Sequence, residues 1–143
     1  TQSDFFRAAT LWVQNDQGEV LIQKRSDKVQ HNPGTYGSAA GGTVDEGGTY
    51  EETVIRESEE EIGLTGIHPK LSLKRLYNGN CFTQWFEIKL NMDITEFTLD
   101  PDEVAELKWF ELSQLQKMVK DNSDNFMPHL IDRINNSELF NNL

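Results

Sequence analysis

Residues 49–64 constrain the fold more than any other stretch of this chain. Thr49 and Glu52 have the spacing of a capping box, in which a threonine caps the start of a helix and a glutamate three residues later bonds back to it. Gly63 is typical of a helix end, where a residue in the left-handed conformation terminates the hydrogen-bond pattern. We therefore predict a helix over residues 49–62.

The rest of the sequence predicts mainly strands before this helix, then strands followed by helices. Residues 6–13 and 20–24 are rich in β-branched and aromatic residues and flank an Asn-Asp-Gln-Gly turn, which predicts a hairpin. The other predicted elements are a loop or irregular strand over 31–42, a second hairpin over 71–77 and 82–90, a strand over 104–110, and helices over 113–120 and 127–135. This order indicates the α/β (α+β) class, with a mixed sheet flanked by helices.

The length of 143 residues indicates a single domain over 1–143. No apolar stretch approaches the ~20 residues of a membrane span, and the polar start, which lacks an initiator Met, does not resemble a signal peptide. Cys81 is the single cysteine, which is typical of a reducing compartment, so we expect a cytoplasmic protein. The net charge of −11 argues against a nucleic acid polymer as partner. A small phosphate compound remains compatible with that charge if metal ions neutralise it.

Helical geometry separates the glutamates of the predicted helix into two groups. At about 100° per residue, Glu59 lies opposite the apolar stripe and is expected to be solvated. Glu57, Glu60 and Glu61 instead flank the stripe, and three carboxylates at one corner repel one another unless a cation joins them. Arg56, one turn before Glu60, has the spacing to orient that carboxylate. We therefore expect a divalent-metal site at this corner.

Residues 42–64 resemble the Nudix box, the signature G-x5-E-x7-R-E-U-x-E-E-x-G-U in which U is a bulky aliphatic residue. Seven of its nine defined positions match: Gly42, Arg56, Glu57, Glu60, Glu61, Gly63 and Leu64. Gly48 stands where the first glutamate is expected, and Ser58 stands where an aliphatic residue is expected. The resemblance extends over about residues 5–115, from the first hairpin to Trp109-Phe110.

The resemblance implies an α/β/α sandwich and a hydrolase that cleaves a diphosphate linked to another group, with Mg²⁺ or Mn²⁺ as cofactor. It implies that Glu57, Glu60 and Glu61 bind metal and serve catalysis, with Arg56 and Gly63 in orienting or structural roles. It further implies a small diphosphate-containing substrate, with neither a nucleic acid polymer nor a membrane as partner. A homodimer is compatible with the family.

The resemblance leaves the general base open between a glutamate of the box and one from a later loop. We prefer Glu103 as the later candidate, because a loop before a strand can point toward the box helix. Glu106 and Glu87 are weaker candidates. The alternative for Glu103 is a solvent-exposed acid in a turn, without a role in catalysis.

Other residues are candidates for contact with the substrate. Arg25, at the end of the second predicted strand, is placed where similar proteins present a basic residue to phosphate. Gly41 and Gly42 permit a close backbone approach beside the metals. Tyr36 has a ring that could stack on the substrate, as could Trp85 and Phe82, although aromatic strand residues more often belong to the core.

Two other functions stay open on the sequence alone. Residues 33–44 and 100–104 resemble isopentenyl-diphosphate isomerases, but the cysteine that those enzymes need near Ala39-Ala40 and their upstream histidines are absent. Cys81 is in another region and is expected to be a structural thiol. The glycine at position 48 also leaves open a non-catalytic module that binds a diphosphate ligand.

Overall fold

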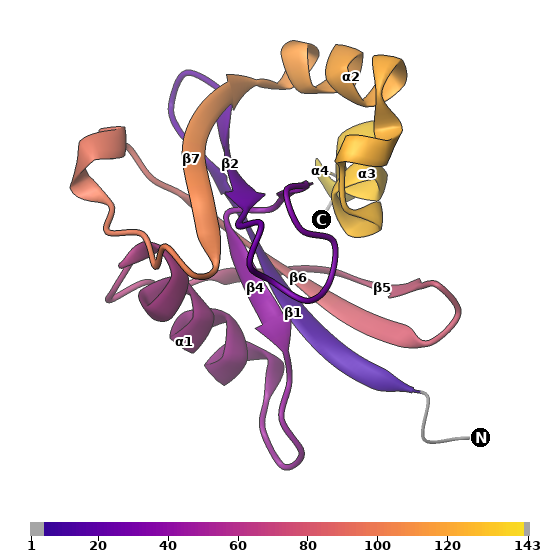
Figure 1. Ribbon diagram of the computed structural model, residues 1–143. Helices are drawn as coiled ribbons and strands as arrows, with labels where there is room; N and C mark the ends of the chain where they lie inside the picture. The colour runs from indigo at the N-terminus through magenta and orange to yellow at the C-terminus, as the bar shows by residue number, and fades with distance from the viewer. Residues whose placement is uncertain (1–4, 142–143) are drawn as a thin grey trace.

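In the computed structural model, which describes residues 5–141, a mixed sheet lies between two groups of helices (Figure 1). Helix α1 packs on one face of the sheet, and α2, α3 and α4 pack on the other. The strands are β1 (Phe6–Gln14), β2 (Glu19–Arg25), β3 (Tyr36–Gly37), β4 (Ala40–Thr43), β5 (Lys70–Tyr77), β6 (Cys81–Lys89) and β7 (Val104–Glu111). The helices are α1 (Tyr50–Ile62), α2 (Leu112–Asp121), α3 (Pro128–Asn135) and α4 (Ser137–Asn141), with 3₁₀ turns η2 (Ile94–Glu96) and η3 (Ser123–Asn125). The predicted fold class is confirmed.

The sheet has the order β3-β2-β1-β6-β5, with β4 paired to β1 and β7 paired to β2. Strands β1 and β6 run parallel, and every other pair in the sheet is antiparallel. The first predicted hairpin is only partly right, because β1 and β2 pair at Gln14 and Val20 and then diverge. Strand β4 takes the place of β2 beside residues 8–11 of β1. The small residues of 39–42 allow this approach, since a Cβ on Gly41 would lie 2.6 Å from the carbonyl oxygen of Ala9.

Helix α1 has the predicted ends. The Thr49 side chain accepts from the Glu52 amide, and the Glu52 carboxylate accepts from the Thr49 amide in return. Gly63 ends the helix at φ 68°. Ser58, which departs from the aliphatic position of the box, is fully buried and donates its hydroxyl to the carbonyl of Val54 at 2.7 Å. The bond to the preceding turn satisfies the hydroxyl, so serine is tolerated on the packed face.

The second hairpin is confirmed, since β5 and β6 are antiparallel around a tight turn. Asn78 and Gly79 have φ of 55° and 73°, the left-handed pair that such a turn requires. Two apolar clusters fill the two sides of the sheet. Examples on the α1 side are Leu11, Leu21, Val54, Ile62 and Phe86, and examples on the other side are Trp12, Ile22, Trp85, Leu130 and Ile134.

Arg133 of α3 fixes the C-terminal helices to the sheet. Its side chain is 2% exposed, and its guanidinium lies over the rings of Trp12 and Phe140 at 4.5 and 4.3 Å from their centroids. It also donates to Glu87 of β6 at 2.8 Å. A buried cation is tolerated where it is paired and hydrogen-bonded in this way.

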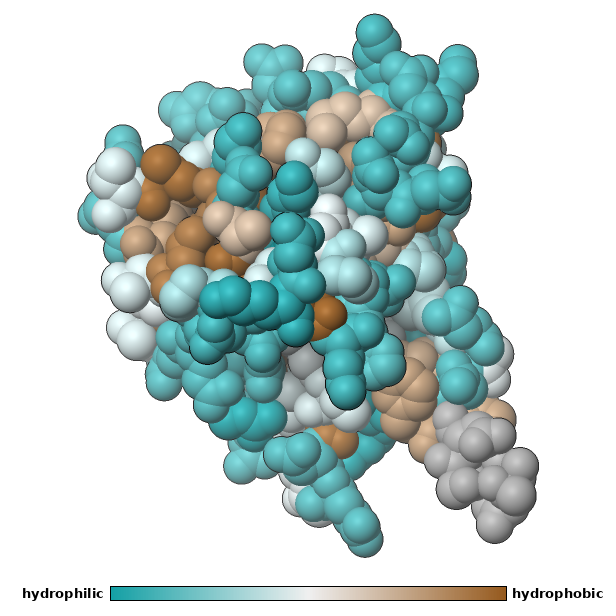
Figure 2. Space-filling model, in the orientation of Figure 1, coloured by the Kyte–Doolittle hydropathy of each residue, from teal (hydrophilic) through white to brown (hydrophobic). Residues whose placement is uncertain are grey.

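The surface of α1 that faces solvent is mainly hydrophilic, and the view in Figure 2 also shows a hydrophobic area near η2 and β7. Among the helices of residues 5–141, none combines the length and apolar character needed to cross a membrane.

Candidate functional site

A cavity of about 540 Å³ opens where β1 and β2 diverge. Its lining comes mainly from β1, β2, β4, β5 and β6, from the end of α1, from the loop after β2 and from the start of α3. Four of the predicted site residues line it together: Arg25, Gly41, Gly42 and Glu61. The cavity therefore joins the end of the box helix to surfaces distant from it in the sequence.

Glu61 reaches into this cavity from α1 and is 8% exposed. The Nε2 atom of Gln23 donates to its Oε1 at 2.9 Å, and the amide of Gly41 approaches the same oxygen at 3.4 Å. Gln23 also donates to the carbonyl of Ala39 at 3.0 Å, so β2 fixes the amide that orients the carboxylate. Burial, followed by contact with the Glu57 carboxylate, raises the pKa of Glu61 to about 9.

The carboxylates of Glu57 and Glu61 therefore form a close pair. Gly42 makes room for Glu57, because a Cβ on that glycine would lie 2.8 Å from Cδ and 3.0 Å from Cγ of the glutamate. The two glycines thus have separate tasks. Gly41 lets β4 approach the backbone of β1, and Gly42 lets the Glu57 side chain lie against β4.

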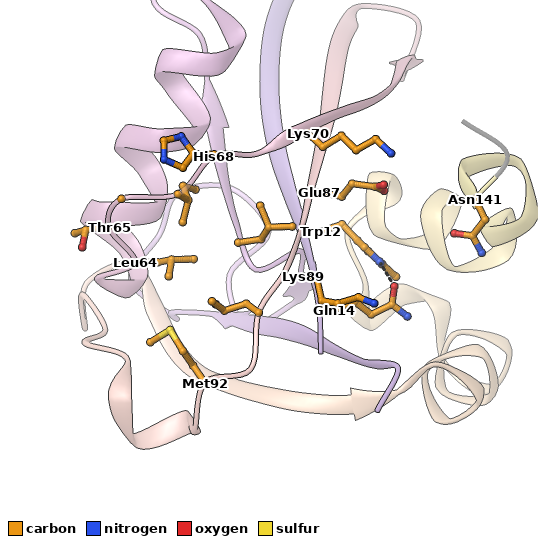
Figure 3. Close-up of a pocket in the computed structure, with 14 residues that line it drawn as sticks. Trp12, Gln14, Leu64, Thr65, His68, Lys70, Glu87, Lys89, Met92 and Asn141 are labelled. Carbon is orange, nitrogen blue, oxygen red and sulfur yellow. Dashed lines mark hydrogen bonds between the residues drawn. The ribbon is translucent and has the colours of Figure 1, made fainter. Parts of the chain in front are cut away.

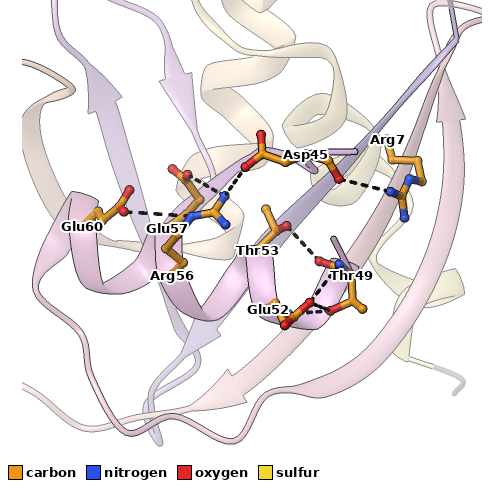
Figure 4. A network of polar contacts seen from close by, with 8 residues as sticks. All are labelled: Arg7, Asp45, Thr49, Glu52, Thr53, Arg56, Glu57 and Glu60. Carbon is orange, nitrogen blue, oxygen red and sulfur yellow. Dashed lines mark hydrogen bonds and ion pairs between the residues drawn. The ribbon is translucent and has the colours of Figure 1, made fainter. Parts of the chain in front are cut away.

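Glu60 does not join this pair, which corrects the prediction of three carboxylates at one corner. Its side chain is 59% exposed and faces Arg56, whose Nε lies 4.0 Å from Oε1 (Figure 4). The same guanidinium lies 3.6 Å from a Glu57 oxygen and 3.8 Å from an oxygen of Asp45. Across residues 5–141, no three acidic, histidine or cysteine side chains converge as a group that could hold a metal. Neighbouring helical residues point about 100° apart, so when Glu61 points inward Glu60 points outward.

The carboxylate pair has the chemistry of a site for a hard divalent cation. Burial of the Glu61 carboxylate, and then its contact with the Glu57 carboxylate, disfavour its charged form, which is why the pKa of Glu61 is raised. Mg²⁺ takes oxygen ligands and is commonly held by one or two carboxylates together with substrate phosphates. Glu57 and Glu61 therefore fit a cation of this class, and the fit does not require Glu60.

The structure places the remaining predicted residues in different surroundings. Arg25 lines the cavity, and its guanidinium donates twice to the carbonyl of His31, at 3.1 and 2.8 Å. Tyr36 is not among the cavity-lining residues, and its ring packs against Phe126 and Phe110 instead. Glu103 has an exposed side chain outside the cavity lining, and its carbonyl accepts from the amide of Ser26 at 2.9 Å.

The loop that contains Glu103 nevertheless lies against the end of the box helix. The amides of Thr98 and Asp100 donate to the carbonyls of Ile62 and Glu61, at 3.1 and 2.9 Å. The assignment of Glu103 as a general base stays a prediction. Gly48, where the box has its first glutamate, forms a turn by donating its amide to the carbonyl of Asp45 at 2.9 Å.

Sequence reasoning missed three residues of this region. Gln23 orients Glu61, Asp45 supplies an acid near Arg56, and His129 lines the cavity from α3. Only Asp45 lies within the box region, where the loop before the helix could have suggested it. Cys81, expected to be structural, also lines the cavity, where its thiol contacts the Thr83 hydroxyl at 3.3 Å.

A second hollow of about 610 Å³ lies between the α1–β5 connection and the end of β6 (Figure 3). Its lining includes Leu64, His68, Lys70, Lys89 and Met92. None of the box glutamates lines this hollow, whereas Glu61 lines the first cavity.

The chain with this fold belongs to the NUDIX domain family: the NUDIX domain model matches residues 4–130. An uncharacterized Nudix hydrolase of Yersinia pestis is 30% identical over 103 residues, which are 72% of this chain and 57% of the relative. The chain thus spans little more than half of that relative's length.

Solved structures show the same fold. A Deinococcus radiodurans protein superposes with a TM-score of 0.78 at 20% identity, covering 92% of this chain and 82% of that one. The MutT protein of Methanosarcina mazei superposes with a TM-score of 0.76 at 21% identity, covering 97% and 96%.

Proposed function

We propose that this chain is a metal-dependent Nudix hydrolase that cleaves the diphosphate linkage of a nucleoside diphosphate joined to another group, or of a related small diphosphate. The observation that carries the proposal is the contact of the Glu57 carboxylate with the buried carboxylate of Glu61, which lines a 540 Å³ cavity. The family membership supports the reaction class. Mg²⁺ or Mn²⁺ is the proposed cofactor.

The residues of the site have distinct tasks in this proposal. Glu57 and Glu61 would hold the cation, which when bound supplies positive charge to the diphosphate and makes a water molecule more acidic. Gln23 holds one Glu61 oxygen in place, so the carboxylate is preorganised and does not reorient during the reaction. Arg25 lines the same cavity and offers a positive charge to phosphate.

Water then attacks phosphorus, and the catalytic effect comes mainly from positioning and charge stabilisation. A general base must accept a proton from that water. A carboxylate of the Glu57–Glu61 pair and Glu103 remain the candidates. Glu103 would have to approach the cavity from the loop that bonds to the end of α1.

The test is phosphate or phosphomonoester release from a panel of nucleoside diphosphate derivatives with Mg²⁺ or Mn²⁺. We expect Glu61→Gln to reduce turnover by about 100-fold or more, because a metal ligand that matters in the transition state is lost. Glu59→Gln is the matched control, since Glu59 is an exposed glutamate of the same helix. Turnover near the wild-type rate in Glu61→Gln would contradict the site assignment.

A second measurement separates metal binding from turnover. Binding of the cation to the folded state alone raises stability by about 2.7 kcal/mol at 100 times Kd, which corresponds to roughly 5–10 °C in Tm for a domain of this size. We expect this rise in wild type and in Glu59→Gln but not in Glu61→Gln. Stabilisation by metal without turnover of any panel member would favour a non-catalytic module that binds a diphosphate ligand.

A further inference from the structure

The catalytic cavity has a second wall that lies across the sheet from the carboxylate pair. The pairing order β4-β1-β6-β5 places Gly41 and Gly42 on one side and Tyr77 on the other. Three strand spacings of about 4.8 Å separate those edges by roughly 14 Å. Residues 127–129, from the start of α3, complete the second wall. A diphosphate held near Glu61 would therefore direct its attached group toward α3.

His129 is a half-buried polar side chain of this wall whose hydrogen-bonding groups remain available. Its ring lies 5.6 Å from that of Trp85 and 6.4 Å from that of Tyr77, measured between centroids. Within residues 5–141, neither of its ring nitrogens makes a hydrogen bond, although the ring is half-buried and lines the cavity.

The hydroxyl of Tyr77 and the thiol of Cys81 beside it already have partners. The Tyr77 hydroxyl donates to Asp132 and accepts from Trp85, and the Cys81 thiol contacts Thr83. Burial, and then the positive charge of Arg25, lowers the pKa of His129 to about 4. The imidazole is therefore neutral near pH 7 and presents one donor and one acceptor.

Asp132, one turn after His129, fixes the helix that carries the histidine. Arg75 of β5 donates to both of its carboxylate oxygens, at 2.9 and 2.8 Å, and the Tyr77 hydroxyl donates at 2.5 Å. These bonds hold α3 against the edge of the sheet, so the position of His129 is set before any ligand enters.

We propose that His129 determines specificity for the group attached to the diphosphate by binding an uncharged heterocyclic ring, and that Asp132 is its positioning residue. The inference rests on the proposed function. Arg25 is the single lysine or arginine among the cavity-lining residues, so one fixed cation serves the diphosphate and none remains for a second anionic group. Met127 and Pro128 beside His129 add apolar surface for the face of a ring.

The experiment compares ADP, which carries such a ring, with methyl diphosphate, which does not. Hydrolysis between the two phosphorus atoms would release phosphate from either compound. We expect His129→Ala to raise KM for ADP about tenfold, the effect of one lost hydrogen bond together with ring packing, with kcat within about threefold. We expect this variant to leave KM for methyl diphosphate unchanged. His129→Asn keeps a donor and an acceptor, so its KM for ADP should rise less.

Positioning by Asp132 predicts the same substrate-dependent rise in KM for Asp132→Asn. Tyr77→Phe is a milder variant, because it removes one partner of the Asp132 carboxylate and leaves Arg75 and Asn136 in place. His68→Ala is the control, since His68 is exposed and lines the other hollow. Equal effects of His129→Ala on the two substrates, or no effect on either, would overturn the proposal.

Calorimetric titration of the protein with ADP or with methyl diphosphate, in the presence of Mg²⁺, measures binding apart from turnover. It therefore tests the role of His129 separately from the proposed hydrolysis. We expect wild type to bind ADP about tenfold more tightly than methyl diphosphate, and His129→Ala to lose that preference. If the preference is present without turnover, the hydrolase proposal fails and the inference stands. If turnover is present and wild type shows no preference, the inference fails alone.

Discussion

Gly42→Ala should separate the proposed catalytic role of the carboxylate pair from the stability of the fold. The new methyl group would lie 2.8 Å from Cδ, 3.0 Å from Cγ and 3.1 Å from Oε2 of Glu57. Such distances are too short to persist, so one group must move. The end of the Glu57 side chain can rotate toward solvent, where it is already 20% exposed. We therefore expect the helix and the sheet to stay in place while the carboxylate leaves Glu61.

The expected changes in stability and in turnover follow from the displacement of the Glu57 side chain. Replacing glycine by alanine at a compatible backbone position stabilises by about 0.4–1 kcal/mol through the unfolded chain. That gain offsets part of the cost of the displaced side chain, so we expect a change in stability of less than about 1 kcal/mol. Loss of one carboxylate from the pair should weaken metal affinity or turnover by about 10–100-fold.

Gly41→Ala provides the contrast one residue earlier. Its methyl group would lie 2.6 Å from the carbonyl oxygen of Ala9 and 3.1 Å from Cα of Thr10, so backbone rather than a side-chain end must move. We expect a loss of about 2–3 kcal/mol from overpacking, which lowers Tm by roughly 5–10 °C.

The assay measures Tm without metal, the rise in Tm with Mn²⁺, and turnover, for wild type and both variants. Gly42→Ala should have the Tm of wild type in the absence of metal. It should lose both turnover and the rise in Tm that Mn²⁺ causes. For Gly41→Ala, the main expected effect is a lower Tm in the absence of metal. A Gly42→Ala protein with the metal response and turnover of wild type would show that the place of Glu57 against β4 does not matter, and the reasoning would be refuted.

Three further predictions concern parts of the fold outside the carboxylate pair. Because the pKa of His129 is about 4 in the folded protein and about 6.5 when unfolded, the unfolded state binds the extra proton first as pH falls, so stability should decrease between pH 6.5 and 4. For a half-buried group we expect a loss of about 2 kcal/mol, measured by urea unfolding, with a smaller loss in His129→Gln. Arg133→Leu leaves Glu87 without its 2.8 Å partner and should cost about 3 kcal/mol in the same assay, whereas an unchanged free energy of unfolding would show that the pair adds nothing. Thr49→Ala removes the helix cap and should cost about 1 kcal/mol with kcat unchanged; a fall in kcat at full folding would contradict a purely structural cap.

The parts of the fold that the sequence predicted well are those set by neighbours along the chain. The capping box of Thr49 and Glu52 lies within one helical turn, and the turn at Asn78-Gly79 depends on the φ of two adjacent residues. The first hairpin was only partly right for the opposite reason. Its turn is local, but the partner of β1 is decided by β4, whose small residues come close to the β1 backbone.

The residues of the candidate site likewise fall into those that the sequence predicted and those that it did not. The motif identified Glu57 and Glu61, because their spacing on one helix is fixed. Gln23 and His129 escaped prediction, because β2 and α3 reach the cavity only after the sheet has formed. A glutamine in a strand and a histidine in an amphipathic helix have no sequence signal that separates them from ordinary surface or core residues.

The exposure of Glu60 follows from the burial of Glu61. Adjacent helical residues point about 100° apart, and the bonds from Gln23 and Gly41 keep Glu61 inside the cavity. Glu60 is then directed outward, where Arg56 lies within 4.0 Å. Any contact of Glu60 with a bound cation therefore requires its side chain to leave Arg56, an exposed pair worth only about 0.5 kcal/mol. In the proposed metal site the buried glutamate would therefore be the fixed ligand, whereas the exposed one is held weakly enough to be recruited when a cation enters the cavity.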